Sequence, residues 1–415
     1  MAEVKGKSLK DCVRHFTPAW FAVIMGTGAI SILFHNFPYG SGTVPMRVFS
    51  AIFFFLNLCL FIVFNALTIA RYTIFPDIWS IMIRHPVQSL YVGCYPMGAA
   101  TLINVSVSLL YSNWNIGGKP FLYVLWAFWW LDVAVSCLCA FPMVHIMKTR
   151  QDHALTRMTA IWILPEVSLI VASSTGGILA PELAKYSVNN ALLTLTVSAV
   201  LVTIGEALAM MILTMYLFRL IIHGIPQGSA VISTFIPLGP MSQGGYAIIL
   251  LGSGFRSILP LSYGNSEFLR SPTTGETIYV LCVCLAIGLW ALATMWLVYS
   301  LLAVGEGLVQ ERFPFKLPLW GLIFPNGVYA NLTIELFYIL DSPFFRIWGV
   351  ITAGTTLVLW SGVFILTLKF VRKGAIFEAP CLEEIDMARS EKRQEDSPGN
   401  ANTNSGTSSS TSVTH

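Results

Sequence analysis

The sequence predicts an all-α polytopic membrane protein whose ten spanning helices form five helical hairpins. Three observations predict this fold. Charged residues make up 11% of the 415 residues and hydrophobic residues 55%, whereas a soluble domain has about 25% charged residues. Apolar runs long enough to cross a bilayer, which takes about 20 residues, recur along the chain. Glycine or proline interrupts alternate runs at a similar depth.

Apolar content sets the bounds of the predicted spans. They are expected at residues 19–37, 46–71, 87–111, 121–147, 160–180, 190–222, 235–259, 277–305, 318–340 and 344–371. Residues 1–18 are polar and basic and are expected to form a cytoplasmic segment without a cleavable signal peptide. The transporter domain then covers residues 19–372. The remainder, 373–415, ends in a run of small polar residues, and we expect a disordered cytoplasmic tail.

The distribution of Lys and Arg predicts the orientation. If the N-terminus is cytoplasmic, 18 of the 24 Lys and Arg residues lie on the inner side and six on the outer side. Because positive residues concentrate on the cytoplasmic side of membrane proteins, both termini are expected in the cytoplasm.

The odd-numbered spans carry a break six to nine residues from their cytoplasmic end. The breaks are expected at Gly26 (with Gly28), Pro96, Pro165, Pro240 and Pro325, at intervals of 70, 69, 75 and 85 residues. Proline frees backbone carbonyls, and such groups are tolerated in a membrane only where protein or a water-filled cavity covers them. A helix that starts at a break also presents a partially positive N-terminus to anions. We therefore expect the odd helices to line a central pore and the even helices to surround them.

Several classes of function find no support in the sequence. The net charge of +3 is too small to indicate a nucleic-acid partner, and the histidines and cysteines show no metal-ligand spacing. The HExxH, GxxxxGK[ST] and GxSxG motifs are absent from the printed sequence. We therefore expect no cofactor, no metal site and no enzymatic activity.

Ionisable groups inside a membrane are costly and indicate function by default. Glu166 directly follows the predicted break at Pro165, which makes it a candidate for proton coupling; a protonated or partnered structural carboxyl is the alternative. Asp132 and Glu206 lie on even helices and are interpreted as structural, with partners that the sequence does not identify.

Uncharged polar residues on the odd helices are candidates for contact with a passing anion. They are Asn104, Ser106, Gln243, Asn326 and Asn331. The alternative for each is a hydrogen bond between helices, which is common in membrane bundles.

Five motifs resemble the fungal sulfite efflux pumps of the tellurite-resistance/dicarboxylate transporter family, to which slow-type anion channels and malate permeases also belong. They are FTPAWFAVIMGTGAISILFHNFPY at 16–39, YPMG at 95–98, YVLW at 123–126, LGPMSQGG at 238–245 and WGLIFPNG at 320–327. The resemblance implies a pore of five odd helices inside five even ones, in a homotrimer with one pore per subunit. It also implies that Phe324 closes the pore and that Tyr95 is a candidate lining residue. Asn326 stands where a methionine commonly follows the proline.

The resemblance implies export of sulfite or bisulfite across the plasma membrane. A malate or dicarboxylate transporter and a chloride or nitrate channel are the alternatives. A dicarboxylate pore would call for arginine at its centre, and the odd helix cores contain no Lys or Arg there, which favours a small, weakly held anion. Whether transport is channel-like or proton-coupled stays open.

Overall fold

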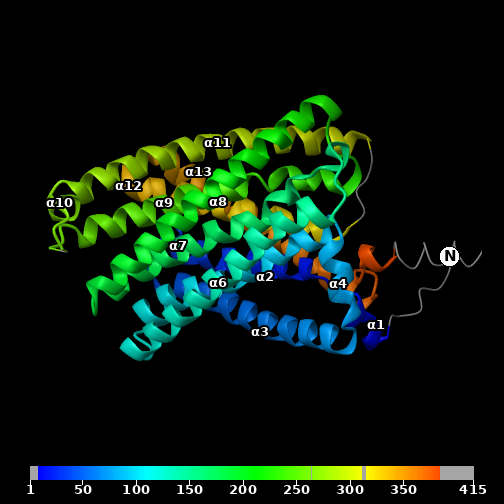
Figure 1. Ribbon diagram of the computed structural model, residues 1–415, viewed down its shortest axis with the longest axis horizontal. Helices are drawn as coiled ribbons and strands as arrows, with labels where there is room; N and C mark the ends of the chain where they lie inside the picture. Colours follow the sequence, from blue (N-terminus) through cyan, green and yellow to red (C-terminus); the bar gives the residue numbers. More distant parts are fainter. Residues whose placement is uncertain (1–7, 263, 311–314, 384–415) are drawn as a thin grey trace, which may run out of the picture.

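The computed structural model describes residues 8–262, 264–310 and 315–383, and within these ranges every regular element is a helix. The α-helices are α1 Leu9–Arg14, α2 Phe21–Asn36, α3 Val44–Ile74, α4 Asp77–Arg84, α5 Cys94–Val105, α6 Gly118–Arg150, α7 Leu164–Ala184, α8 Val188–His223, α9 Leu238–Ile258, α10 Glu267–Arg270, α11 Thr274–Gln310, α12 Ile323–Leu340 and α13 Pro343–Arg372. A π-helical stretch, Ser106–Asn113, extends α5. The long helices run side by side, with α1 and α4 at one end of the bundle and α10 at the other (Figure 1).

Eight helical segments of the described chain are long and apolar enough to cross a membrane. They contain α2, α3, α5, α6, α7, α8, α11 and α13. The chain is therefore a multi-pass membrane protein of helical type. Helices α9 and α12 coincide with the other two predicted spans but are not among these eight, so the count of ten spans stays a prediction.

The spans fall into two groups by burial. In the segments of α2, α5 and α7, between 78% and 94% of the residues in the apolar stretch are buried, against 17–39% for α3, α6, α8, α11 and α13. Helices α9 and α12 are also buried along most of their length. Buried and exposed helices thus alternate along the chain.

The buried helices contact one another in a closed circuit, which we call the inner ring. Helix α2 contacts α5, α5 contacts α7, α7 contacts α9, α9 contacts α12, and α12 contacts α2. Each of them also packs against the next long helix of the chain: α3, α6, α8, α11 and α13, respectively. The sequence-predicted pore helices are therefore neighbours in space.

Each inner helix begins with a 3₁₀ turn that leads into the α-helix. These turns are Pro18–Trp20, Gln88–Gly93, Ala160–Ile163, Gly228–Phe235 and Leu317–Leu322. The four predicted prolines then occupy the second or third α-helical position, where a missing N–H costs no hydrogen bond within the helix. They mark the start of the α-helix and do not interrupt it.

The prediction of a break at Gly26 and Gly28 is wrong, because α2 is continuous from Phe21 to Asn36. The two glycines instead allow other helices to approach. A Cβ atom at Gly28 would lie 2.1 Å from the Thr101 hydroxyl oxygen of α5, and one at Gly26 would lie 3.1 Å from Cβ of Ile323.

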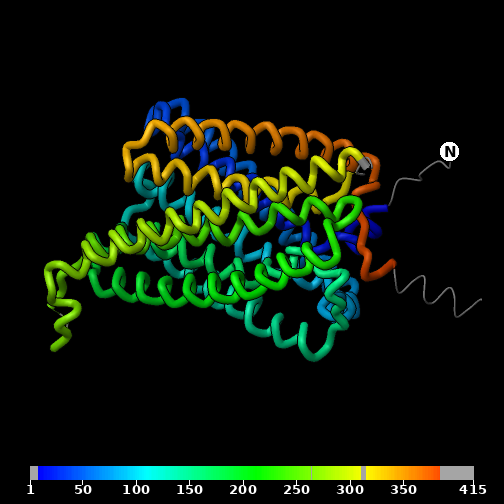
Figure 2. Tube along the Cα trace, turned by 90° about the horizontal axis from the view of Figure 1, so that it is seen from above, coloured from blue at the N-terminus to red at the C-terminus, as the bar shows by residue number. Residues whose placement is uncertain are grey.

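The prediction of a disordered tail from residue 373 is wrong for its first part. Ring centroids of Phe377 and Trp20 lie 5.2 Å apart in a stacked pair. Ala379, Cys381 and Leu382 are buried in one cluster with Ile78 of α4. This segment lies at the same end of the bundle as α1 (Figure 2). The rest of the predicted tail, 384–415, falls outside the described residues, as do residues 1–7 of the N-terminal segment.

Candidate functional site

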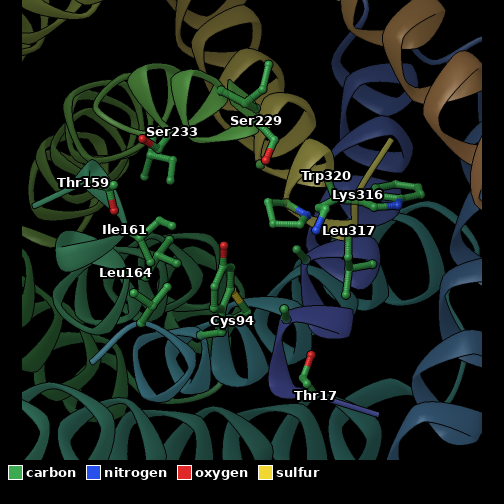
Figure 3. Close-up of a pocket in the computed structure, with 18 of the residues that line it drawn as sticks. Thr17, Cys94, Thr159, Ile161, Leu164, Ser229, Ser233, Lys316, Leu317 and Trp320 are labelled. Atoms are coloured by element: carbon green, nitrogen blue, oxygen red, sulfur yellow. The ribbon is translucent and has the colours of Figure 1, made fainter. Parts of the chain in front are cut away.

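A cavity of about 340 Å³ lies where the five inner helices begin, and we call it the vestibule. Figure 3 shows its side chains arranged around an open centre. Among the wall residues, each inner helix and the segment that leads into it provide a pair three positions apart. The pairs are Ala22 and Met25, Cys94 and Met97, Leu164 and Val167, Ile236 and Gly239, and Gly321 and Phe324.

These pairs of wall residues recur along the chain at nearly the same intervals as the prolines of the predicted breaks. The first members of the pairs are 72, 70, 72 and 85 residues apart, close to the intervals between the predicted breaks. Residues three apart share one face of a helix. Five helices therefore turn the same face toward one cavity.

A second cavity of about 20 Å³ continues the same faces farther along the inner helices, and we call it the polar chamber. Apart from Phe324 and Gly327, its wall residues lie four or seven positions after the second member of a pair. The polar ones are Thr101, Asn104, Gln243, Tyr246 and Asn331. Phe324 lines both the vestibule and the polar chamber. Among the described residues, it is the one that the two walls share.

The amides of the polar chamber are partly engaged with neighbouring helices. Nε2 of Gln243 donates to the Ser174 hydroxyl at 2.5 Å, and Nδ2 of Asn36 donates to Oδ1 of Asn331 at 2.7 Å. The Tyr246 hydroxyl oxygen also accepts hydrogen bonds from the side chains of Asn331 and Asn36. These bonds orient Gln243 and Asn331 and leave one N–H of each amide able to donate. The chamber can therefore offer neutral donors to an anion.

The predicted site residues separate into two groups. Phe324, Pro240 and Pro325 line the vestibule, and Asn104, Gln243 and Asn331 line the polar chamber. The other predicted residues line neither cavity: Gly26, Gly28, Pro96, Pro165, Tyr95, Ser106, Asn326 and Glu166.

Two of these residues make contacts inside the protein. Tyr95 packs edge-on against Phe21, with ring centroids 5.0 Å apart, and stacks on Phe61. Asn326 donates its amide hydrogen to the Leu322 carbonyl at 2.7 Å, one turn back on its own helix. Neither residue is among those that line the vestibule or the polar chamber.

Glu166 is buried, and its carboxyl oxygens have no hydrogen-bond partner in the described part of the chain. Its neighbours Leu164 and Val167 face the vestibule, whereas Ile170, one turn on from Glu166, packs against Gly205 of α8. Glu166 therefore lies behind the vestibule wall. A charged carboxylate without a partner is costly in such a place.

The two other intramembrane acids show the same pattern. Neither carboxyl oxygen of Asp132 or Glu206 has a hydrogen-bond partner among the residues described. A Cβ atom at Gly244 would lie 1.6 Å from Oε1 of Glu206, so α9 passes close over that carboxyl. The ion-pair partners sought for these acids are not found in residues 8–262, 264–310 or 315–383.

The sequence analysis missed one charged pair in the vestibule. Nζ of Lys316 lies 3.0 Å from Oε2 of Glu378, and both residues line the cavity. In the sequence, Lys316 contributed only to the prediction of membrane orientation. Glu378 fell within the predicted disordered tail. In the residues described, His, Cys, Asp and Glu side chains do not gather in groups of three or more that would hold a metal.

The chain is similar to transport proteins along most of its length. Residues 15–368 match the protein family described as voltage-dependent anion channel. A sulfite efflux pump of Arthroderma benhamiae is 34% identical over 357 residues, which cover 86% of this chain and 91% of that protein. One of Saccharomyces cerevisiae is 25% identical, covering 84% and 85%. A malic acid transport protein of Schizosaccharomyces pombe is 24% identical, covering 85% and 77%.

Proposed function

The chain belongs to the voltage-dependent anion channel family, and we propose that it exports sulfite or bisulfite across the plasma membrane through the inner ring. The proposed pore is five-fold pseudo-symmetric, with α9 and α12 spanning the membrane alongside α2, α5 and α7. Proteins similar to this one are named as anion transporters, which supports transport rather than catalysis. We propose the trimer with one pore per subunit on the family resemblance.

One observation carries the pore proposal: Phe324 lines both cavities. The two cavities follow the same faces of the five inner helices, so together they trace one path along the ring axis. An apolar side chain across such a path blocks hydrated ions, because it removes the water that an ion needs. We infer that Phe324 is the gate.

The charge distribution supports outward transport. Lys and Arg favour a cytoplasmic location for the end of the bundle that contains α1 and the vestibule. A potential that is negative inside favours the exit of an anion by about 2.3 kcal/mol per charge per 100 mV. A passive pore with this orientation would export sulfite down its electrochemical gradient.

The polar chamber supports a small anion over a dicarboxylate. Among the described residues, its wall contains amide and hydroxyl groups and no Lys or Arg, so these residues do not provide the bidentate contacts that hold a carboxylate. Neutral donors bind an oxyanion weakly enough to release it. Malate transport is the second candidate, because a relative carries that name.

Flux from proteoliposomes tests the proposal. Vesicles loaded with sulfite, malate or chloride would be assayed for efflux with an imposed potential, with an imposed pH gradient, and with neither. We expect sulfite efflux that increases with a negative potential on the side of loading. Efflux of malate without efflux of sulfite would overturn the substrate assignment, and a strict requirement for the pH gradient would indicate a proton-coupled carrier.

A further inference from the structure

The charged pair of the vestibule lies in the path of the substrate. Lys316 and Glu378 are the cation and the anion among the described residues of the vestibule wall. Lys316 directly precedes the 3₁₀ turn Leu317–Leu322 that leads to Phe324. Figure 3 places it beside Trp320, on one side of the opening. An anion that enters from this end therefore meets one positive side chain before it reaches the gate.

Two other cations near this end are already engaged and line neither cavity. Arg71 is fully buried and donates to the Phe16 carbonyl at 2.5 Å. Arg219 donates to the carbonyls of Thr156 and Gly224 at 2.9 and 2.5 Å. Both guanidinium groups hold loops in place, whereas the Lys316 ammonium group borders open space.

The segment that carries Glu378 does not depend on the ion pair for its position. Phe377 stacks on Trp20, and Leu382 is buried in the cluster with Ile78. The paired side chains are 45% and 43% exposed, and a pair so exposed contributes little to stability. Apolar contacts therefore hold a carboxylate over Lys316 that another anion can displace.

We propose that Lys316 captures the substrate anion at the vestibule and that Glu378 is a tethered competitor for the same ammonium group. The inference rests on the proposed anion export and adds the residue that first binds the substrate. Like a carboxylate, sulfite or bisulfite presents oxygen atoms that accept charge-assisted hydrogen bonds from an ammonium group. Transport begins when the free anion replaces the Glu378 carboxylate.

The test measures initial sulfite efflux against internal sulfite concentration in proteoliposomes at low ionic strength. Glu378→Gln removes the competitor and should lower the half-saturating concentration several-fold. Lys316→Gln removes the capture site and should raise it several-fold, while Lys316→Arg keeps the charge and should stay near the wild-type value. The double variant Lys316→Gln/Glu378→Gln should behave like Lys316→Gln alone. All differences should shrink at high salt, which screens exposed charges.

A matched control removes a pair elsewhere in the fold. Lys185 and Glu182 form an ion pair at 2.5 Å and line neither cavity, so Glu182→Gln should leave the concentration dependence unchanged. If Glu378→Gln and Lys316→Gln both weaken transport, the pair merely fastens the segment and the inference is overturned. Unchanged kinetics in both variants overturn it as well. A wild-type protein that moves no sulfite contradicts the proposed function instead, so the two failures are distinguishable.

Discussion

The proposed gate depends on the side chains at one position of the repeat. The residues at the position of Phe324 in the other inner helices are Met25, Met97, Val167 and Gly239. All five are apolar or lack a side chain. Gly239 belongs to α9, the neighbour of α12 in the ring, and a Cβ atom there would meet nothing within 4 Å. The space next to Gly239 is therefore open, and Gly239 and Phe324 both line the vestibule.

Replacing Phe324 with alanine should raise anion flux, because the apolar barrier between the vestibule and the polar chamber disappears. We expect a several-fold increase in current per surface protein and weaker discrimination between sulfite and chloride. Patch-clamp current normalised to surface abundance measures both effects. A decrease in normalised current would end the gate assignment.

Phe64→Ala is the matched control for this variant. Phe64 is buried against Phe16 and Trp20 and lines neither cavity. Truncating a buried phenylalanine costs about 3–5 kcal/mol on the soluble-protein scale. We therefore expect fewer molecules at the surface and no increase in the current that each one carries.

Glu166→Gln tests whether the buried carboxyl senses protons. Its neighbours Leu164 and Val167 line the vestibule, so a negative charge at Glu166 opposes an anion in the path. Acidification neutralises a carboxylate, and wild-type nitrate flux should therefore rise as the pH falls. Glutamine is neutral at every pH, so the variant should keep a high flux that varies little with pH. Nitrate is the probe because its own charge does not change over this range.

Asp132→Asn serves as the control, since Asp132 is also buried but lies on the outer helix α6. We expect it to preserve the pH dependence of the wild type. An unaltered pH profile in Glu166→Gln would return Glu166 to a structural role. The sequence alone did not decide this point, because it shows that a carboxyl follows Pro165 and not which way the side chain turns.

At the scale of the helix, the prolines predicted local structure better than the glycines did. Pro96, Pro165, Pro240 and Pro325 all lie within the first three residues of an inner α-helix, because proline fits that turn without losing a hydrogen bond. Glycine has two distinct uses, and Gly26 serves close packing rather than a change of direction. Which residues face a cavity depends on where each inner helix starts. The sequence alone does not show that starting residue.

Gly28→Ala should destabilise the contact between α2 and α5. The added Cβ atom would lie 2.1 Å from the Thr101 hydroxyl oxygen and 2.9 Å from the Asn57 amide nitrogen. Overpacking of this kind costs about 1–3 kcal/mol. We expect a lower thermal unfolding midpoint in nanodiscs and a smaller yield of folded protein.

The control is Gly362→Ala on the outer helix α13, where a Cβ atom would meet nothing within 4 Å. Alanine favours a helix over glycine by up to about 1 kcal/mol, so this variant should be as stable as the wild type or more so. Equal stability of the Gly28 and Gly362 variants would show that α2 and α5 can separate without cost.

For the whole molecule, composition predicted the membrane class and the positions of the helices, but it was wrong about the start of the tail. Helices α9 and α12 contain several polar residues, such as Gln243 and Asn331, which line the polar chamber, so apolar content alone does not establish that these two helices span the membrane. The predicted bounds of the tail followed from its average composition. Its average polarity is set by its final residues, whereas Ile376, Phe377 and Leu382 near its start bury against the bundle.

Two truncations separate the packed segment from the rest of the tail. A chain that ends after Glu383 keeps every described contact of the segment, so sulfite resistance and surface abundance should match the full-length protein. A chain that ends after Arg372 loses the Phe377–Trp20 stack and the buried Leu382. We expect it to be less abundant at the surface and to unfold at a lower temperature.

The flux per molecule decides what the segment does for transport. The chain that ends after Arg372 also loses Glu378, so Lys316 faces the vestibule without its paired carboxylate. At low sulfite concentration each remaining molecule should then carry at least the wild-type efflux, although there are fewer of them. Surface biotinylation gives the number of molecules, and efflux divided by that number gives the rate. A rate well below that of the wild type would mean that residues 373–383 support the pore itself, because the lost apolar contacts would then outweigh the gain at Lys316.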